Sequence, residues 1–173
     1  MNRHASHIEV EPGVFLESAG LYFEDVIAGE TYEHRPGRTF PAGENPTASL
    51  RTLDLSPLGI DEHYRSQTES GVAEINPLQV VAVMTGMMTK AFSRVVANLA
   101  WKKVIFHSPL RVGETLYAET TVLEKRESKS RPGQGILHLR TSGFAADGRL
   151  VCTFERLVLV YQRGEGPYAK AGY

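Results

Sequence analysis

The longest apolar segment of the chain covers residues 76–96, "NPLQVVAVMTGMMTKAFSRVV". Its apolar residues suit a helix that is buried on most sides rather than along one stripe. Asn76 is a good N-cap residue, and Pro77 fits the first helical position, where a backbone N–H would have no partner inside the helix. The pattern therefore predicts one long buried helix over about residues 76–96.

The second half of the chain alternates between apolar and polar residues with the period of a β-strand. Residues 114–128, 134–146 and 148–163 are three such stretches, separated by the turn sequences "RPGQG" and "ADG". Short links of this kind join antiparallel neighbours, so we predict a three-stranded meander. Two more strands, at residues 31–40 and 102–110, give an α+β domain in which an antiparallel sheet wraps around the helix.

We expect this single domain to span residues 21–163. Residues 1–20 are predicted to form an extended N-terminal arm, and residues 164–173 a C-terminal tail. Residues 41–72 are rich in Pro, Gly, Ser and Thr and show no long periodic pattern. A loop of that length is seldom idle in a compact domain, so we expect short helices or a functional role there.

Composition excludes several classes of function. The chain has 173 residues and a formal net charge of −1, which gives no general attraction to nucleic acid or to an anionic membrane. Its single cysteine, Cys152, excludes an intrachain disulfide and a cysteine-based metal site. The N-terminal residues lack the apolar core of a signal peptide, and no uninterrupted apolar run reaches the length of about 18 residues typical of a membrane helix. We therefore expect a cytoplasmic protein.

Three stretches, residues 20–40, 96–132 and 147–161, carry a resemblance to a known family, and "LYAETTVLEKRESKSRP" is the most specific part. They resemble the MaoC-like hydratase/dehydratase family, which has the hot-dog fold, and above all its mesaconyl-CoA hydratase-like branch. The resemblance implies an enzyme that adds water to acyl-CoA thioesters or removes it. Such a reaction needs a base for the water, an acid for the α-carbon and a hydrogen-bond donor for the thioester oxygen.

The catalytic loop of that family has the pattern Asp-x-Asn-Pro-x-His-x-Asp, in which the first Asp and the His form the acid/base pair. In this chain Asp54 takes the place of the first Asp, Ser56 takes that of the Asn, and Gly59 falls on the His. Moving His63 into the histidine position would misplace both the proline and the final aspartate. The resemblance thus implies that Asp54 is the surviving acid/base group, with Ser56 as a polar positioning group. A cap of a short helix or turn is an equally simple role for Asp54.

The family usually takes its thioester-oxygen donor from the backbone N–H of a Gly at the start of the buried helix. Asn76 and Pro77 stand at that point, and proline has no N–H to donate. A second part of the usual apparatus is therefore missing. His63, Glu69 and Glu74 are candidate substitutes, although each is more simply explained as a surface or helix-start residue.

The phosphates of CoA would have to bind a local cluster of cations in a chain of this net charge. One cluster lies in the turn at residues 125–131, and another follows the only tryptophan. Besides Asn76 and Pro77, the predicted substrate contacts are Arg126, Lys129, Arg131, Trp101, Lys102 and Lys103. An ordinary solvated surface is the competing explanation for both clusters.

These features favour a MaoC-like hydratase or dehydratase of small or branched acyl-CoA thioesters, with an altered site and no metal or redox cofactor. One alternative is a non-catalytic acyl-CoA binder, or the silent partner of an active hydratase subunit, which Gly59 and Pro77 favour. Another is a hot-dog thioesterase, in which Glu69 or Glu74 would be the residue of interest. Because such domains usually dimerise with the site at the subunit boundary, we expect a homodimer, an assembly of dimers, or a heteromer with an active subunit.

Overall fold

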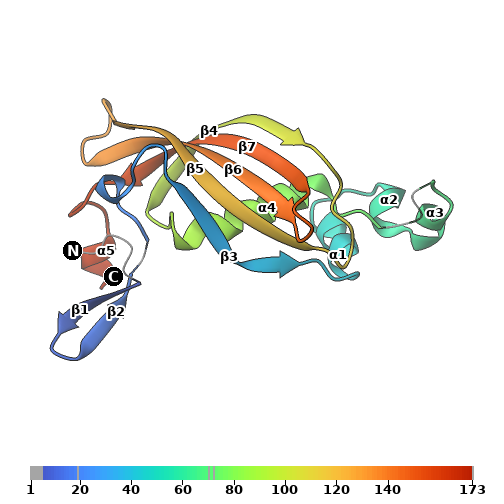
Figure 1. The fold of residues 1–173 in the computed structure, drawn as a ribbon, viewed down its shortest axis with the longest axis horizontal. Helices are drawn as coiled ribbons and strands as arrows, with labels where there is room; N and C mark the ends of the chain where they lie inside the picture. The colour runs from blue at the N-terminus through green and yellow to red at the C-terminus, as the bar shows by residue number, and fades with distance from the viewer. Residues whose placement is uncertain (1–5, 19, 70, 72, 173) are drawn as a thin grey trace.

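The computed structural model describes residues 6–18, 20–69, 71 and 73–172. Its main feature is a five-stranded antiparallel sheet in the order β3-β5-β6-β7-β4, which curves along helix α4 (Figure 1). The elements are β3 (Thr31–Thr39), α4 (Pro77–Met87), β4 (Val95–Phe106), β5 (Thr115–Glu127), β6 (Gln134–Ala145) and β7 (Leu150–Tyr161). The predicted α+β hot-dog domain with an antiparallel sheet around one central helix is confirmed. Within α4 only Val80 and Met84 are buried, and Leu78 is 71% exposed, so the helix is not buried on most sides as expected.

Alternation along the meander places one face of the sheet against the helix. On β6, Leu137 and Leu139 are fully buried whereas Arg140 is exposed. The buried leucines join Val158 of β7 in one apolar cluster. Burying a side chain of this size stabilises the fold by about 1.5–3 kcal/mol, so this alternation fixes which face of each strand points inward.

Helix α4 begins as predicted but ends earlier. The Asn76 side chain caps it by accepting a hydrogen bond from the backbone N–H of Leu78 at 2.9 Å. The helix stops at Met87, a 3₁₀ turn (η2, Met88–Lys90) follows, and β4 starts at Val95, so the prediction of helix to residue 96 is wrong.

Tertiary contacts explain the early end of the helix. Val95 pairs with Val160 of β7, which draws this part of the chain into the sheet. Arg94 is 3% exposed, and its guanidinium lies 3.8 Å from the ring centre of Tyr22 and 4.2 Å from that of Tyr168. These contacts override the apolar pattern, which continues past Met87.

The segment between β3 and α4 forms three short helices: α1 (Glu44–Arg51), α2 (Pro57–Ile60) and α3 (Glu62–Ser66). They lie at one end of the sheet (Figure 1). The predicted N-terminal arm contains a hairpin of β1 (His7–Glu11) and β2 (Val14–Glu17). The 3₁₀ turn η1 (Phe23–Asp25) follows this hairpin, and the C-terminal tail contains α5 (Tyr168–Ala171). No helix among the described residues is both long and apolar enough to cross a membrane.

Candidate functional site

The start of α4 meets the loop at residues 54–59 through a hydrogen bond between two predicted site residues. Asn76 Nδ2 donates to Asp54 Oδ2 at 2.7 Å, and the backbone N–H of Ser56 donates to Asp54 Oδ1 at 3.1 Å. Because Asn76 Oδ1 already caps the helix, its amide nitrogen is the end that faces Asp54. The half-buried Asp54 carboxylate is therefore held in one orientation beside the helix start.

The backbone donors at this helix start are already engaged. Pro77 has no N–H, and the N–H of Leu78 donates to the Asn76 side chain. The N–H groups of the next two residues donate to the Asn76 carbonyl at 2.9 and 3.2 Å. Within this described segment, no backbone N–H of the first helical turn is free to bind a thioester oxygen.

Asn45 on α1 ties this helix start to the short helices, and sequence reasoning missed it. The residue is 2% exposed; its Nδ2 donates to the carbonyl of Glu74 at 3.0 Å, and its Oδ1 accepts from the backbone N–H of Asn76 at 2.9 Å. These partners lie 29 and 31 residues further along the chain. No local sequence signal could have identified this contact.

Gly59 lies against α1, at the position that the family resemblance assigns to the catalytic histidine. A Cβ atom at this position would lie 2.7 Å from Ser49 Oγ, closer than real Cβ contacts. Ser49 is 1% exposed, and its hydroxyl has no hydrogen-bond partner among the described residues. A histidine at position 59 would therefore require the Ser49 hydroxyl to rotate away or be removed.

Two pockets share Asp54 and Asn76 as lining residues. The first, here called the loop pocket, has a volume of about 320 Å³ and is also lined by Ser49, Ser56, Leu58, Gly59, Arg65, Glu74, Ile75, Asn45 and Pro77. The second, here called the helix pocket, has a volume of about 470 Å³ and lies between α1 and α4; it is also lined by Glu44, Thr47, Ala48, Arg51, Thr52, Leu78, Gln79 and Ala82. The Asp54–Asn76 hydrogen bond thus borders two pockets, one of which contains Gly59 and the other one side of α1.

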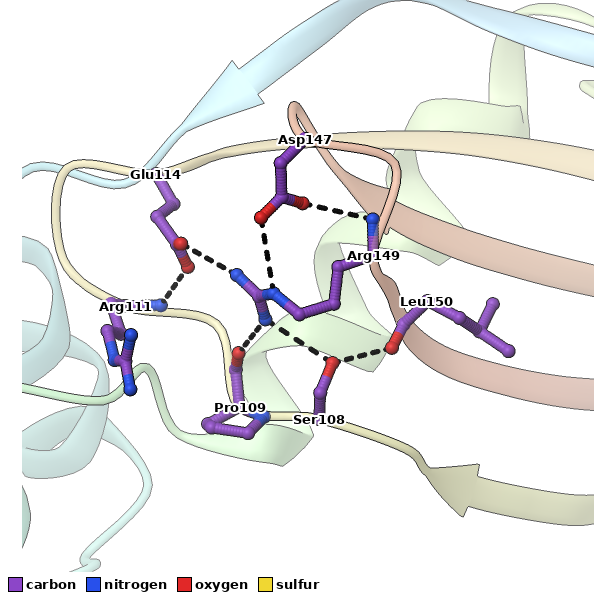
Figure 2. A network of polar contacts seen from close by, with 7 residues as sticks. All are labelled: Ser108, Pro109, Arg111, Glu114, Asp147, Arg149 and Leu150. Carbon is purple, nitrogen blue, oxygen red and sulfur yellow. Dashed lines mark hydrogen bonds and ion pairs between the residues drawn. The ribbon is translucent and has the colours of Figure 1, made fainter.

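A polar brace stabilises the loop after β4, as Figure 2 shows, with Arg149 at its centre. Arg149 Nη2 donates to Glu114 Oε1 at 2.6 Å, and its Nη1 donates to Ser108 Oγ at 3.3 Å and to the carbonyl of Pro109. The backbone N–H of Arg149 also donates to Asp147 at 3.0 Å. One guanidinium therefore connects the β6–β7 turn to the loop after β4.

That loop in turn positions the segment that leads into α4. The N–H of Ile75 donates to the carbonyl of Leu110 at 2.7 Å, and the N–H of Val112 donates to the carbonyl of Ala73 at 2.9 Å. Asn76 follows directly after these contacts. The brace in Figure 2 thus supports the residue that orients Asp54, although it does not itself line either pocket.

The remaining acid/base candidates separate into two groups. Glu74 is exposed and lines the loop pocket. His63 and Glu69 are also exposed, but neither lines the loop pocket or the helix pocket. In the described part of the chain, no group of three or more His, Cys, Asp or Glu side chains could hold a metal ion.

The predicted CoA contacts in the β5–β6 turn lie at the other end of the sheet from α1 (Figure 1), whose residues line both pockets. Strand β5 has 13 residues, so its ends are roughly 40 Å apart at about 3.3 Å per residue. Lys125, at the base of the turn, donates to the carbonyls of Phe23 and Val26 at 2.8 and 2.7 Å and is a structural residue. Arg126, Lys129 and Arg131 could therefore reach a CoA only at a site other than the pockets of their own subunit.

The second predicted cluster, on β4, is divided between the two faces of the sheet. Trp101 packs on Phe154 with ring centres 5.0 Å apart, and the Arg156 guanidinium lies 5.1 Å from its ring centre. Lys103 Nζ lies 3.1 Å from a carboxylate oxygen of Glu155, which is 3% exposed. Lys102 is exposed next to them. A role for these residues in CoA binding stays a prediction.

Glu155 also interacts with His138, which was not among the predicted site residues. His138 Nε2 and Arg140 Nη2 lie 2.9 and 3.0 Å from its carboxylate oxygens. Burial alone raises the pKa of Glu155, but the hydrogen bonds from Arg140, Lys103 and His138 outweigh it and lower the pKa to about 2. This cluster stabilises the outer face of the sheet.

Comparison with known proteins relates this chain to mesaconyl-CoA hydratases. The profile of a family described as mesaconyl-CoA hydratase matches residues 14–171. The mesaconyl-CoA hydratase of Cereibacter sphaeroides is 28% identical over 155 residues, which make up 89% of this chain and 45% of that protein. The chain therefore spans about half the length of the curated relatives it matches.

Two solved structures show the same architecture. A Mycobacterium tuberculosis protein with a double hot-dog fold superposes with a TM-score of 0.74 at 28% identity, covering 86% of this chain and 46% of that one. A putative MaoC domain dehydratase from Chloroflexus aurantiacus superposes with a TM-score of 0.78 at 23% identity, covering 83% and 41%. This chain therefore corresponds in fold to one part of each of these longer proteins.

Proposed function

Because the chain belongs to the mesaconyl-CoA hydratase family, we propose that it binds small or branched enoyl-CoA thioesters at the Asp54–Asn76 pair and hydrates them slowly. The observation that carries this proposal is the position of that pair, which lines both the loop pocket and the helix pocket. In the proposed complex the acyl group lies in the loop pocket. The pantetheine arm lies in the helix pocket, where Ala48, Leu78 and Ala82 offer an apolar wall.

The proposed chemistry assigns both proton transfers to one group. Water adds its oxygen to the β-carbon of the enoyl group, and Asp54 accepts the proton that the water loses. Asp54 then delivers that proton to the α-carbon, because no imidazole stands at position 59 to share the work. Asn76 keeps the carboxylate oriented through the 2.7 Å hydrogen bond.

The second candidate function is a non-catalytic acyl-CoA binder or a silent partner subunit. A specific observation favours it: the backbone N–H groups at the start of α4 are engaged by Asn76. The enolate oxygen would then lack its usual donor, a loss that costs about 10²–10³-fold in rate elsewhere.

A turnover assay on the parent protein tests the proposed function. We expect hydration of crotonyl-CoA or mesaconyl-CoA at least about 10²-fold slower than an ordinary enzymatic rate of about 10 s⁻¹, together with measurable binding of the thioester. Turnover at an ordinary rate would show that another group replaces the histidine. Binding without any turnover would favour the silent partner, and no binding at all would refute both candidates.

We further propose that the chain dimerises through β4, one of the two edge strands of the sheet. An edge strand leaves backbone groups unpaired and invites pairing with a second chain. The exposed apolar residues of β4 are Leu99, Trp101, Val104, Ile105 and Phe106. A double hot-dog relative of about twice the length supports a pairwise arrangement of such domains.

Light scattering at micromolar concentration is expected to show a dimer or an assembly of dimers. Ile105→Lys, which places a charge on the β4 edge, should shift the population towards monomer. Val10→Lys is the matched control, because Val10 is 53% exposed on the separate N-terminal hairpin. A monomeric parent, or equal behaviour of the two variants, would contradict dimerisation through β4.

A further inference from the structure

Arg65 is the only cationic side chain among the described residues that line the loop pocket. The residue is half-buried on α3, and its Nη1 donates to the carbonyl of Leu58 at 3.2 Å. This hydrogen bond fixes one end of the guanidinium but uses only one of its five N–H groups. No carboxylate among the described residues forms an ion pair with Arg65. The guanidinium therefore keeps donors for a ligand in the loop pocket.

The thioester oxygen is the atom of the proposed reaction that needs such a donor. It gains negative charge as the enolate forms, and a positioned hydrogen-bond donor stabilises that charge. The backbone N–H groups in the first turn of α4 do not serve this purpose, because they donate to the side chain and the carbonyl of Asn76. A side chain of the pocket wall has to take over this task.

Among the described side-chain donors of the pocket wall, only Arg65 carries a charge. The hydroxyls of Ser49 and Ser56 are neutral donors in the same wall. A hydrogen bond that involves an ionised group is roughly twice as strong as one between neutral groups. Ser49 is also only 1% exposed, whereas Arg65 is partly exposed. A developing oxyanion is therefore stabilised best by the guanidinium.

The acidic groups of the loop pocket leave Arg65 unneutralised. Asp54 directs its two oxygens towards Asn76 and the N–H of Ser56. Glu74 is exposed. The volume of about 320 Å³ lies at the small end of the range for ligand pockets, roughly 300–1,000 Å³. A thioester bound there would therefore lie close to both the Asp54 carboxylate and the Arg65 guanidinium.

We infer that Arg65 is a second catalytic residue, whose guanidinium donates to the thioester oxygen in place of the engaged N–H groups of α4. This inference rests on the proposed function and deepens it. When the water oxygen bonds to the β-carbon, an electron pair moves onto the thioester oxygen beside Arg65. When Asp54 delivers the proton to the α-carbon, that pair returns and the carbonyl is restored. Arg65 keeps its own protons throughout and acts through its charge.

The infrared carbonyl band of a bound thioester tests this contact without turnover. Butyryl-CoA with a heavy carbon isotope at the thioester carbonyl cannot be hydrated, and that carbonyl holds the only oxygen of its acyl group. A hydrogen bond from Arg65 weakens the carbonyl bond and lowers its stretching frequency. The band should therefore lie at lower frequency in the parent complex than in that of Arg65→Met, with Arg65→Lys between them. With crotonyl-CoA, Arg65→Met should lower kcat by about 10²–10³-fold and change KM little.

Arg111→Met is the matched control, because Arg111 is exposed on the loop after β4 and lines neither the loop pocket nor the helix pocket. It should leave the band and kcat unchanged. The inference is overturned if Arg65→Met leaves the band in place, or if Ser49→Ala or Ser56→Ala moves it further than Arg65→Met does. An unchanged kcat of Arg65→Met beside an active parent would also overturn it. The band decides the inference even for a parent without turnover, whereas failure to bind butyryl-CoA would refute the proposed function itself.

Discussion

Asp54→Asn is expected to lower the rate of enoyl-CoA hydration by about 10²–10⁴-fold, the usual contribution of one positioned acid/base group. Asparagine keeps the size of the side chain and can still accept a hydrogen bond from Asn76, but it cannot take a proton from water. Binding of the thioester should change little, because the pocket walls stay in place. The measurement is kcat and KM for mesaconyl-CoA, and the loss should appear in kcat.

Asp61→Asn is the control for this variant. Asp61 belongs to the same loop but caps α3 by accepting from the N–H of Tyr64 at 2.9 Å, and it lines neither pocket. Asn is as good an N-cap as Asp, so activity and stability should both stay near those of the parent. If the two variants lose activity equally, the effect arises from the folding of the loop, and Asp54 is not the acid/base group.

The free energy of unfolding is expected to fall by about 3 kcal/mol as the pH decreases from 6.5 to 4, because of His34. His34 is 4% exposed on β3, and its Nε2 lies 2.8 Å from Thr120 Oγ1. Burial, and to a smaller extent the charge of Arg35, lowers the pKa of His34 from 6.5 to about 4. Between these values the unfolded chain binds a proton that the folded chain does not, so stability rises with pH and is complete above 6.5.

Urea unfolding at a series of pH values would measure this dependence. His34→Gln should flatten the curve between pH 6.5 and 4, whereas His63→Gln should leave it unchanged, because His63 is exposed on α3. Glu155 contributes in a separate range. Because the pKa of Glu155 in the folded protein is about 2, its contribution to the free energy of unfolding is lost only as the pH falls from about 4.5 towards 2. A parent curve that is flat between pH 6.5 and 4 would show that His34 can be protonated without cost.

The sequence predicted the elements whose determinants are local. The helix start was predictable because the Asn76 cap and the first-turn proline act within two residues. The meander was predictable because its turns and its alternation are local as well. The end of α4 was not predictable, because Val95 leaves the helical pattern only through its pairing with Val160, which is distant in sequence.

The candidate site also contains both residues that could be predicted from the sequence and residues that could not. Asp54, Gly59, Asn76 and Pro77 could be named in advance through the family resemblance, and the loop pocket contains all four. Ser49 and Arg65 could not, because their roles depend on how α1 and α3 fold back around the loop. Single residues on short helices carry no periodic signal, and their importance becomes visible only in the folded chain.

The contact between Gly59 and Ser49 also has an evolutionary consequence. The effect of a substitution at position 59 depends on the residue at position 49. A single Gly59→His substitution would place its Cβ 2.7 Å from the buried Ser49 hydroxyl on α1. The Ser49 hydroxyl would have to rotate away, or a change such as Ser49→Ala would have to remove it, before the histidine could be accommodated. We therefore expect epistasis between these two positions, with Gly59→His tolerated better in a chain that already carries Ser49→Ala.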